Sequence, residues 1–210
     1  MKDNAYRTSE RQLDFIKETI NIGVGQAAAS LNSLVDSHVD LSLPGIRIMS
    51  LEELAEDQAP LFRDKLSYVR LSFSGPFAGA AMIAFPTEDA VVLVSSLTGV
   101  ESTSSGLDAV MAGALNKVGN IIINAVIGSI SNLLNEELDF VMPEYVEGTL
   151  ADVVVQDRED ASFAAVVAYI DFRIDRLKVA GNIILVFELV SFNSFLSSVD
   201  RALRASEIIE

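Results

Sequence analysis

Residues 13–46 read LDFIKETINIGVGQAAASLNSLVDSHVDLSLPGI, and residues 112–145 read AGALNKVGNIIINAVIGSISNLLNEELDFVMPEY. Both stretches carry an asparagine that is followed, after 22 intervening residues, by a proline, and the two pairs are offset by 99 positions. The pairs are Asn21 with Pro44 and Asn120 with Pro143. Farther along the chain, an Ala-Gly step precedes an apolar run at Gly79 and again at Gly181. The sequence therefore predicts that the chain is internally duplicated.

The duplicated unit predicts an α+β fold. Apolar residues recur at helical spacing in the first stretch, and runs rich in strand formers follow it. We expect helices at 9–35, at 87–99, from Ser105 or Asp108 to 134, and at 194–206, and strands at 39–49, 67–73, 79–85, 139–155, 164–174 and 181–189. The expected architecture is a single domain over residues 1–210. Its two pseudo-symmetric halves, about 9–99 and about 105–206, are intertwined helix, strand, hairpin and helix units that share a central sheet and display their two long helices on one side.

Capping residues mark the ends of two of these helices. Ser9 and Gln12 have the spacing of a capping box at the start of the first helix. Thr87 is expected to cap the helix that follows the first hairpin, and Gly99 is expected to end it.

The composition excludes several classes of function. The 210 residues carry 15 Lys and Arg against 30 Asp and Glu, a formal net charge of −15, so a basic surface for nucleic acid is lacking. The chain has no cysteine and one histidine, His38. This composition excludes a Cys/His zinc site, a disulfide framework and a cysteine nucleophile, and it argues against a Ser-His-Asp triad.

The mean hydropathy of the chain, +0.36, raises the question of a membrane-spanning segment, and the longest uncharged stretch is residues 118–135. Four asparagines and two serines lie in that stretch, and amides without partners are costly to bury in hydrocarbon. The N-terminal residues MKDNAYRTSERQLDF lack the apolar core of a signal peptide. We therefore expect a cytoplasmic protein that does not insert into a membrane.

One face of the first long helix carries the candidate functional residues. Asp14, Glu18, Asn21 and Gly25 fall at i, i+4, i+7 and i+11, so they form one row along the helix surface. Gly25 and the nearby Gly23 each cost about 1 kcal/mol relative to alanine in a helix interior. Either close packing against the sheet or clearance for an approaching partner would compensate for this cost. The equivalent row of the second long helix is Gly113, Lys117, Asn120 and Asn124.

The spacing along the first row resembles a known signature. It is similar to the signature of the CheC/CheX/FliY phosphatases of bacterial and archaeal chemotaxis. That signature is Asp or Ser, then three residues and Glu, then two residues and Asn, then 22 residues and Pro. Here it reads Asp14, Glu18, Asn21 and Pro44. The duplicated arrangement covers nearly the whole chain, so it resembles the CheC branch rather than the shorter CheX. No extension resembles the additional segments of FliY.

The resemblance implies a chemistry for the row. The substrate would be the phosphoaspartate of a CheY-like response regulator, which supplies its own Mg²⁺, so no cofactor of this chain is implied. In the family, the Asn positions the attacking water and the Glu forms a salt bridge with the regulator's active-site lysine. When these family roles are carried over to this chain, the resemblance implies that Glu18 and Asn21 are the catalytic residues. It also implies that Asp14, Glu18 and Gly25 contact the partner. Positioning and charge balance are the available means of catalysis, because phosphoryl transfer passes through a loose transition state.

The second row departs from the signature. Lys117 stands where the family has Glu, and Gly113 stands where it has Asp or Ser. A docked regulator would bring its own lysine against Lys117, and desolvated like charges are strongly unfavourable at an interface. We therefore expect Lys117 and Asn120 to form a degenerate, inactive second site, in which Asn120 has a structural role as a cap or in a local hydrogen bond.

Two other functions fit parts of the pattern. The first is a non-catalytic adaptor that binds a response regulator or a CheD-type deamidase, with which CheC relatives pair. An adaptor needs affinity but not Asn21, whereas a phosphatase needs Asn21 for its rate. The second is a structural part of the flagellar switch related to the middle domain of FliM, which shares the fold but lacks the Glu and Asn. The complete first signature argues against this second alternative.

Overall fold

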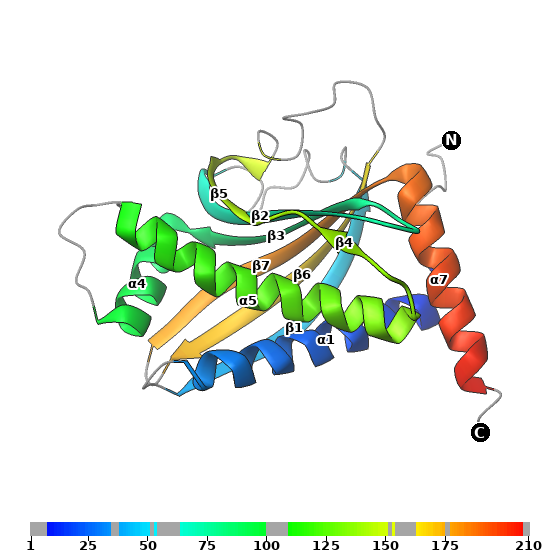
Figure 1. Ribbon diagram of the computed structural model, residues 1–210, viewed down its shortest axis with the longest axis horizontal. Coiled ribbons are helices and arrows are strands. Elements are labelled where there is room, and N and C mark those ends of the chain that lie inside the picture. The colour runs from blue at the N-terminus through cyan, green and yellow to red at the C-terminus, as the bar shows by residue number, and fades with distance from the viewer. Residues whose placement is uncertain are drawn as a thin grey trace.

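The computed structural model describes residues 8–34, 38–50, 53, 64–99, 109–150, 153, 163–174 and 177–207. In chain order its elements are α1 (Glu10–Asn32), β1 (Val39–Ser50), β2 (Leu66–Ser74), β3 (Gly79–Pro86), α4 (Thr87–Thr98), α5 (Ala109–Leu134), β4 (Asp139–Phe140), β5 (Glu144–Gly148), β6 (Phe163–Ile174), β7 (Leu177–Glu188) and α7 (Leu189–Glu207). The strands form one sheet, and every strand pair in it is antiparallel. The long helices α1 and α5 lie side by side across one face of this sheet (Figure 1).

The strands of the two parts of the chain alternate in the sheet. We call the part from α1 to α4 the N-terminal half and the part from α5 to α7 the C-terminal half. The strand order is β1-β6-β7-β3-β2-β4, and β5 also pairs with β2. The N-terminal hairpin is β2 with β3, and the C-terminal hairpin is β6 with β7. Thus β1 pairs with β6 of the C-terminal hairpin, while β4 and β5 pair with β2 of the N-terminal hairpin. The predicted intertwined α+β architecture, with both long helices on one side, is confirmed.

The apolar stripes of α1 and α5 hold the two helices on the sheet. Ile20 of α1 and Ile122 of α5 are fully buried in the same core as Val69 of β2. Burying a side chain of this size stabilises the fold by about 1.5–3 kcal/mol relative to leaving it exposed. A smaller apolar cluster, which includes Tyr68 and Met82, covers the opposite face of the sheet. The helix pair is therefore fixed from below, and its outer surface is left available.

Among the described residues, α5 is the one helix whose length and composition would allow it to cross a membrane, with a mean hydropathy of 1.5 over its most apolar window. Of that window, 44% is buried inside the protein. The buried side chains face α1 and the sheet, so the apolar character of α5 is accounted for by core packing.

Several element boundaries differ from the predictions. The capping box is confirmed, because Gln12 N donates to Ser9 Oγ at 3.2 Å and Ser9 N donates to Gln12 Oε1 at 2.8 Å. The prediction that Thr87 caps α4 is wrong: the chain passes directly from β3 into the helix, so Pro86 takes the N-cap position without a side-chain hydrogen bond. Gly99 ends α4 in the left-handed conformation, as predicted, with φ of 70°.

The C-terminal half shows two further differences. Helix α7 begins at Leu189, five residues earlier than predicted, because the extra turn buries Phe192 beside Phe187. The strand predicted at 139–155 is instead the two short strands β4 and β5 in its described part. The predicted start of the second long helix at Ser105 or Asp108 lies outside the described residues.

The two glycines of α1 have different surroundings. A Cβ atom at Gly23 would lie 2.5 Å from Val126 Cα and 2.9 Å from the carbonyl oxygen of Ala125. Gly23 therefore lies directly against the backbone of α5. A Cβ atom at Gly25 would have no such neighbour within 4 Å. Close packing therefore explains Gly23, although against α5 rather than against the sheet, and it does not explain Gly25.

We expect Gly23→Ala to lower the free energy of unfolding by about 1–3 kcal/mol, because the added methyl group meets the backbone of α5 and cannot be accommodated by a side-chain movement. Gly25→Ala is the matched control, and it should raise the free energy of unfolding by about 0.5–1 kcal/mol, since it removes a helix-interior glycine without a clash. Urea denaturation of both variants measures the difference. Equal stabilities would show that the crossing of α1 and α5 is looser than the structure indicates.

Candidate functional site

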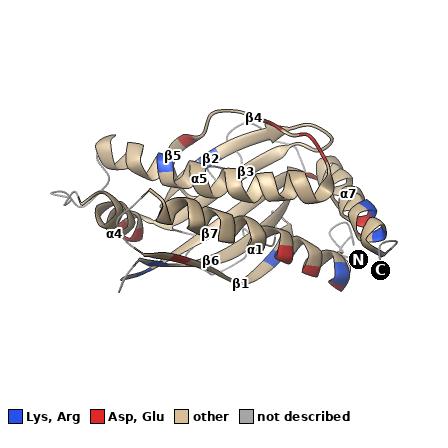
Figure 2. Cartoon of the chain, turned by 60° about the horizontal axis from the view of Figure 1, so that its bottom comes forward, with Lys and Arg blue, Asp and Glu red and all other residues tan. Residues whose placement is uncertain are grey.

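Asp14, Glu18, Asn21 and Gly25 all lie on the exposed side of α1, opposite the buried side that carries Ile20. No described residue forms an ion pair with Glu18 or a hydrogen bond with the Asn21 side chain. The charged residues of α1 lie in its first half, and the second half is uncharged (Figure 2). The structure thus places the four residues on one accessible face, with the carboxylates toward the start of the helix and the amide at its middle.

The first turn of α1 is anchored by Gln12. The Oε1 atom of this side chain closes the capping box with Ser9, and its Nε2 atom donates to Asp200 Oδ1 of α7 at 2.8 Å. A capping interaction of this kind stabilises a helix start by about 0.5–2 kcal/mol. Asp14 and Glu18 therefore project from a helix whose beginning is fixed both locally and by α7.

The second row has a different arrangement. Gly113, Lys117 and Asn124 of α5 are exposed, and Asn120 is half-buried. Asn124 Nδ2 donates a hydrogen bond of 2.7 Å to Asn120 Oδ1. The amide of Asn120 is thus engaged within its own helix, whereas the corresponding position to Asn124 in α1 is Gly25, which has no side chain.

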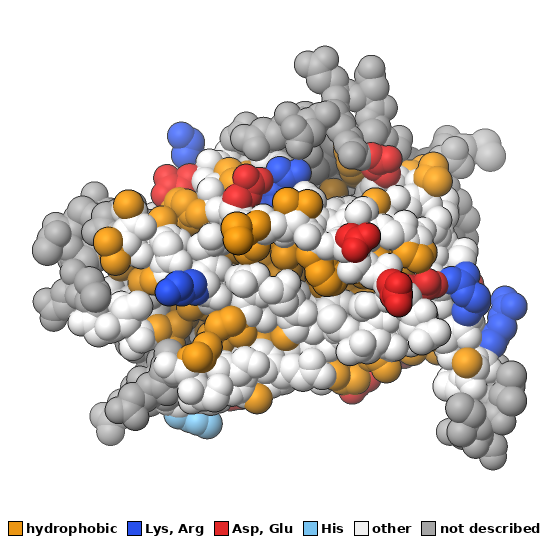
Figure 3. Space-filling view, in the orientation of Figure 1, with side chains coloured by type: hydrophobic (Ala, Val, Ile, Leu, Met, Phe, Trp, Pro, Cys, Tyr) orange, Lys and Arg blue, Asp and Glu red, His pale blue; other side chains and the backbone are white. Residues whose placement is uncertain are grey.

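The two rows occupy opposite ends of the helix pair. Phe15 and Thr19, near the start of α1, line the same small crevice as Ile130 and Leu134, near the end of α5, so the helices run antiparallel. Glu18 near the start of α1 is therefore distant along the pair from Lys117 near the start of α5. The surface over the middle of the pair carries few charged groups (Figure 3).

The two prolines of the repeat lie at irregular points of the sheet. Pro44 lies in β1, where the register with β6 shifts between Ser42 and Gly45. Pro143 immediately precedes β5, and its carbonyl oxygen accepts a hydrogen bond of 3.4 Å from Asn116 Nδ2 of α5. A proline lacks the N–H that a regular ladder requires, which favours such positions. Each proline therefore marks the irregular strand that follows the long helix of its half.

Two curated relatives align with this chain. The CheY-P phosphatase CheC of Bacillus subtilis (strain 168) is 24% identical over 142 residues, which cover 64% of this chain and 66% of CheC. The flagellar motor switch phosphatase FliY of the same organism is 21% identical over 154 residues, which cover 72% of this chain and 39% of FliY. The alignment thus spans slightly less than two thirds of one relative and about two fifths of the other. No family model matches the chain.

Solved structures share the fold. The crystal structure of Thermotoga maritima FliY superposes with a TM-score of 0.73 at 17% identity, and the superposition covers 93% of this chain and 98% of that one. The chain is therefore similar to members of the CheC/CheX/FliY family in sequence and in fold. The middle domain of FliM from H. pylori superposes with a TM-score of 0.66 at 14% identity, over 91% of this chain and 99% of the FliM domain. This fold is therefore shared with both FliY and the FliM middle domain, and a shared fold does not by itself assign a function.

In this CheC-like chain the described residues include no group of three or more His, Cys, Asp and Glu residues that could hold a metal ion. The row on α1 supplies two carboxylates, those of Asp14 and Glu18, side by side on the exposed face. Such a row suits contact with a partner's surface.

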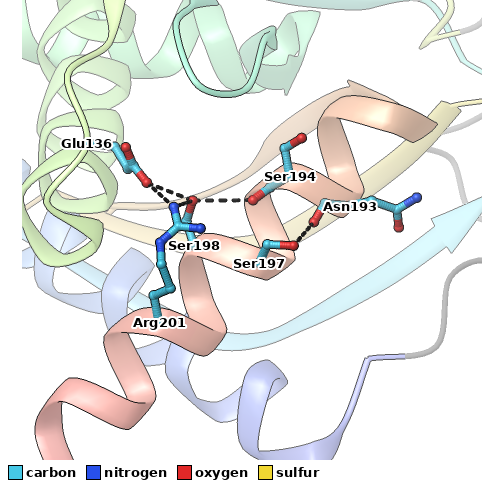
Figure 4. A network of polar contacts seen from close by, with 6 residues as sticks. All are labelled: Glu136, Asn193, Ser194, Ser197, Ser198 and Arg201. Carbon is cyan, nitrogen blue, oxygen red and sulfur yellow. Dashed lines mark hydrogen bonds and ion pairs between the residues drawn. The ribbon is translucent and has the colours of Figure 1, made fainter.

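A polar network between α5 and α7 of this chain was not predicted from the sequence (Figure 4). Glu136, just after α5, accepts a hydrogen bond of 2.9 Å from Ser198 Oγ of α7 and pairs with Arg201, whose Nη2 atom donates to Ser198 Oγ at 2.8 Å. These contacts fasten α7 to the end of α5, while Gln12 fastens it to the start of α1. The contacts that join α7 to α1 and α5 link residues 62 to 188 positions apart in the chain, so no local sequence pattern predicts them.

Proposed function

We propose that this protein hydrolyses the phosphoaspartate of a CheY-like response regulator, with Glu18 and Asn21 as its catalytic residues. One observation carries the proposal: the signature residues of the first row share one exposed face of α1, and no described residue occupies the functional groups of Glu18 and Asn21. The relatedness to the CheY-P phosphatase CheC supports the same reaction class. The proposal places the protein in the cytoplasm with its regulator.

Asn21 is proposed to orient the attacking water. Its carboxamide offers an acceptor and a donor on neighbouring atoms, so it can hold a water molecule in one orientation for in-line attack on phosphorus. A strong general base is not needed, because a loose transition state requires little deprotonation of the water at an early stage. An amide meets this need at any physiological pH, since it does not titrate.

Glu18 is proposed to anchor the regulator. Its carboxylate lies one helical turn before Asn21 on the same face, so a salt bridge from Glu18 to the regulator's active-site lysine would bring the phosphoryl group toward the amide. Asp14 and Gly25 extend this contact surface at its two ends. The Mg²⁺ ion of the reaction belongs to the regulator, and no step is assigned to a metal ion held by this chain.

A decay assay tests the proposed function. A CheY-like regulator is phosphorylated with a small-molecule phosphodonor, the donor is removed, and the loss of phosphoaspartate is followed with and without this protein. Faster decay at substoichiometric protein supports a phosphatase. Binding without faster decay indicates an adaptor for the regulator. If the protein neither binds the regulator nor speeds the decay, the remaining alternatives are an adaptor for a CheD-type deamidase and a structural part of the motor switch.

We expect one regulator to bind per chain, and we expect Asn120→Ala to change the decay rate by less than about twofold. A regulator that approached Asn120 would bring its own lysine toward Lys117, which is exposed three residues before it in the same row. Calorimetry with a beryllofluoride-activated regulator gives the stoichiometry. Two regulators per chain, or a large loss of rate in Asn120→Ala, would show that the second site is functional.

A further inference from the structure

We propose that Gly25 is a positioning residue that keeps the Asn21 carboxamide free for water, and that Asn124 removes Asn120 from catalysis by occupying the same place in the C-terminal half. This inference rests on the proposed phosphatase function and adds a second cause, independent of Lys117, for the inactivity of the second row. It assigns a role to a position that the family signature does not include.

The C-terminal half shows what a side chain at this position does. Asn124 lies four residues after Asn120, on the same helix face, and its Nδ2 atom donates to Asn120 Oδ1 at 2.7 Å. A carbonyl oxygen has two lone pairs, so this bond does not exhaust the acceptor capacity of Asn120. It does direct the Asn120 carbonyl oxygen toward Asn124 and places a second side chain beside the amide. Turning the Asn120 amide toward a water molecule on a partner would break this bond.

The N-terminal half lacks this restraint. Gly25 lies four residues after Asn21, and a Cβ atom there would have no neighbour within 4 Å. Both residues are exposed, and no described residue bonds to the Asn21 side chain. Because glycine is unfavourable inside a helix and packing does not require it here, its benefit has to lie in what it leaves open.

The repeat allows the two asparagines to be compared within one chain. Asn21 and Asn120 occupy the same place in two helices of the same fold, and each follows its helix's Glu18 or Lys117 by three residues. They differ at the position four residues later, where one helix has no side chain and the other has a donor. In a helix, side chains four residues apart are neighbours, so an asparagine at 25 would reach Asn21 as Asn124 reaches Asn120.

Gly25→Asn and Gly25→Leu separate hydrogen bonding from bulk, since the two side chains have similar size and branching but leucine has no donor. Both variants fill the space beside Asn21, so both are expected to raise KM in the decay assay to a similar extent. Gly25→Asn is expected to have a kcat about tenfold lower than that of Gly25→Leu, because a misdirected positioning group is costly in phosphoryl transfer. Equal kcat values for the two variants would overturn the proposal, since bulk alone would then account for the effect.

A spectroscopic measurement on the full chain tests the same inference without activity. The carboxamide Cγ resonance of Asn120 is expected to move upfield in Asn124→Ala, where its hydrogen bond is lost, and that of Asn21 to move downfield in Gly25→Asn, where one forms. Unchanged resonances would overturn the proposal even if the rates differed. If the wild-type protein does not accelerate decay, the proposed function fails by itself, and the resonances still report whether position 25 controls the amide.

Discussion

Asn21→Ala is expected to slow dephosphorylation of the regulator by about 100-fold or more while its affinity for the regulator is kept. The variant removes the one group proposed to orient the attacking water. Asn21 is exposed and no described residue bonds to its side chain, so the substitution breaks no described contact of the fold. Single-turnover decay of the phosphorylated regulator at saturating protein measures the rate, and calorimetry with a stable phosphate mimic measures the affinity.

Asn120→Ala is the control for this experiment, because it removes the same side chain from the equivalent place in α5. A rate that is unchanged in Asn21→Ala would exclude the phosphatase mechanism and favour the adaptor. A loss of affinity equal to the loss of rate would make Asn21 a docking residue rather than a catalytic one.

Glu18→Ala is expected to weaken binding of the activated regulator by about 2–5 kcal/mol, because the regulator's lysine would lose its partner in a partly desolvated interface. Glu18→Lys should weaken binding further, since it places one ammonium group against another and reproduces the arrangement at Lys117. Titration of the regulator in its stable activated form, at low and at high salt, measures both effects. High salt should reduce the difference between the Ala and Lys variants.

Glu137→Ala serves as the matched control for Glu18→Ala, because it also removes one exposed carboxylate but lies beyond the end of α5, outside the row. It should leave binding within about 0.5 kcal/mol of the wild type. Equal affinities for the wild type and both Glu18 variants would remove Glu18 from the mechanism. An equal loss in Glu137→Ala would instead indicate a general effect of net charge or a docking surface that extends to the end of α5.

Much of the fold was predictable because its repeat and its helices are periodic in sequence. The Asn-to-Pro spacing identified the two halves, and the apolar period of α1 identified its buried side. The early start of α7 was not predictable, because it depends on the packing of Phe192 against Phe187, which is a tertiary contact. The division of the predicted strand into β4 and β5 likewise depends on how Pro143 and its neighbours meet β2 and α5.

The candidate row was also predictable, since residues at i and i+4 share a helix face whatever the rest of the fold. The different surroundings of Gly23 and Gly25 were not, because only the crossing of α1 with α5 distinguishes the two glycines. The hydrogen bond from Asn124 to Asn120 is local, and its spacing is visible in the sequence, but the sequence alone does not show which rotamers the two amides adopt. The family roles of Glu18 and Asn21 await the two experiments above.

Because the strands of the two halves are interleaved in one sheet, neither half is expected to fold without the other. If the chain were divided after α4, β1 would lose β6, its only partner in the described sheet, and β2 would lose both β4 and β5. Strand edges exposed in this way promote aggregation rather than independent folding. Helix α1 would also lose the surface of α5 on which Gly23 rests. The C-terminal half can therefore lose signature residues such as the Glu that Lys117 replaces, but it cannot lose its strands, because the N-terminal half needs them to complete its own sheet pairing.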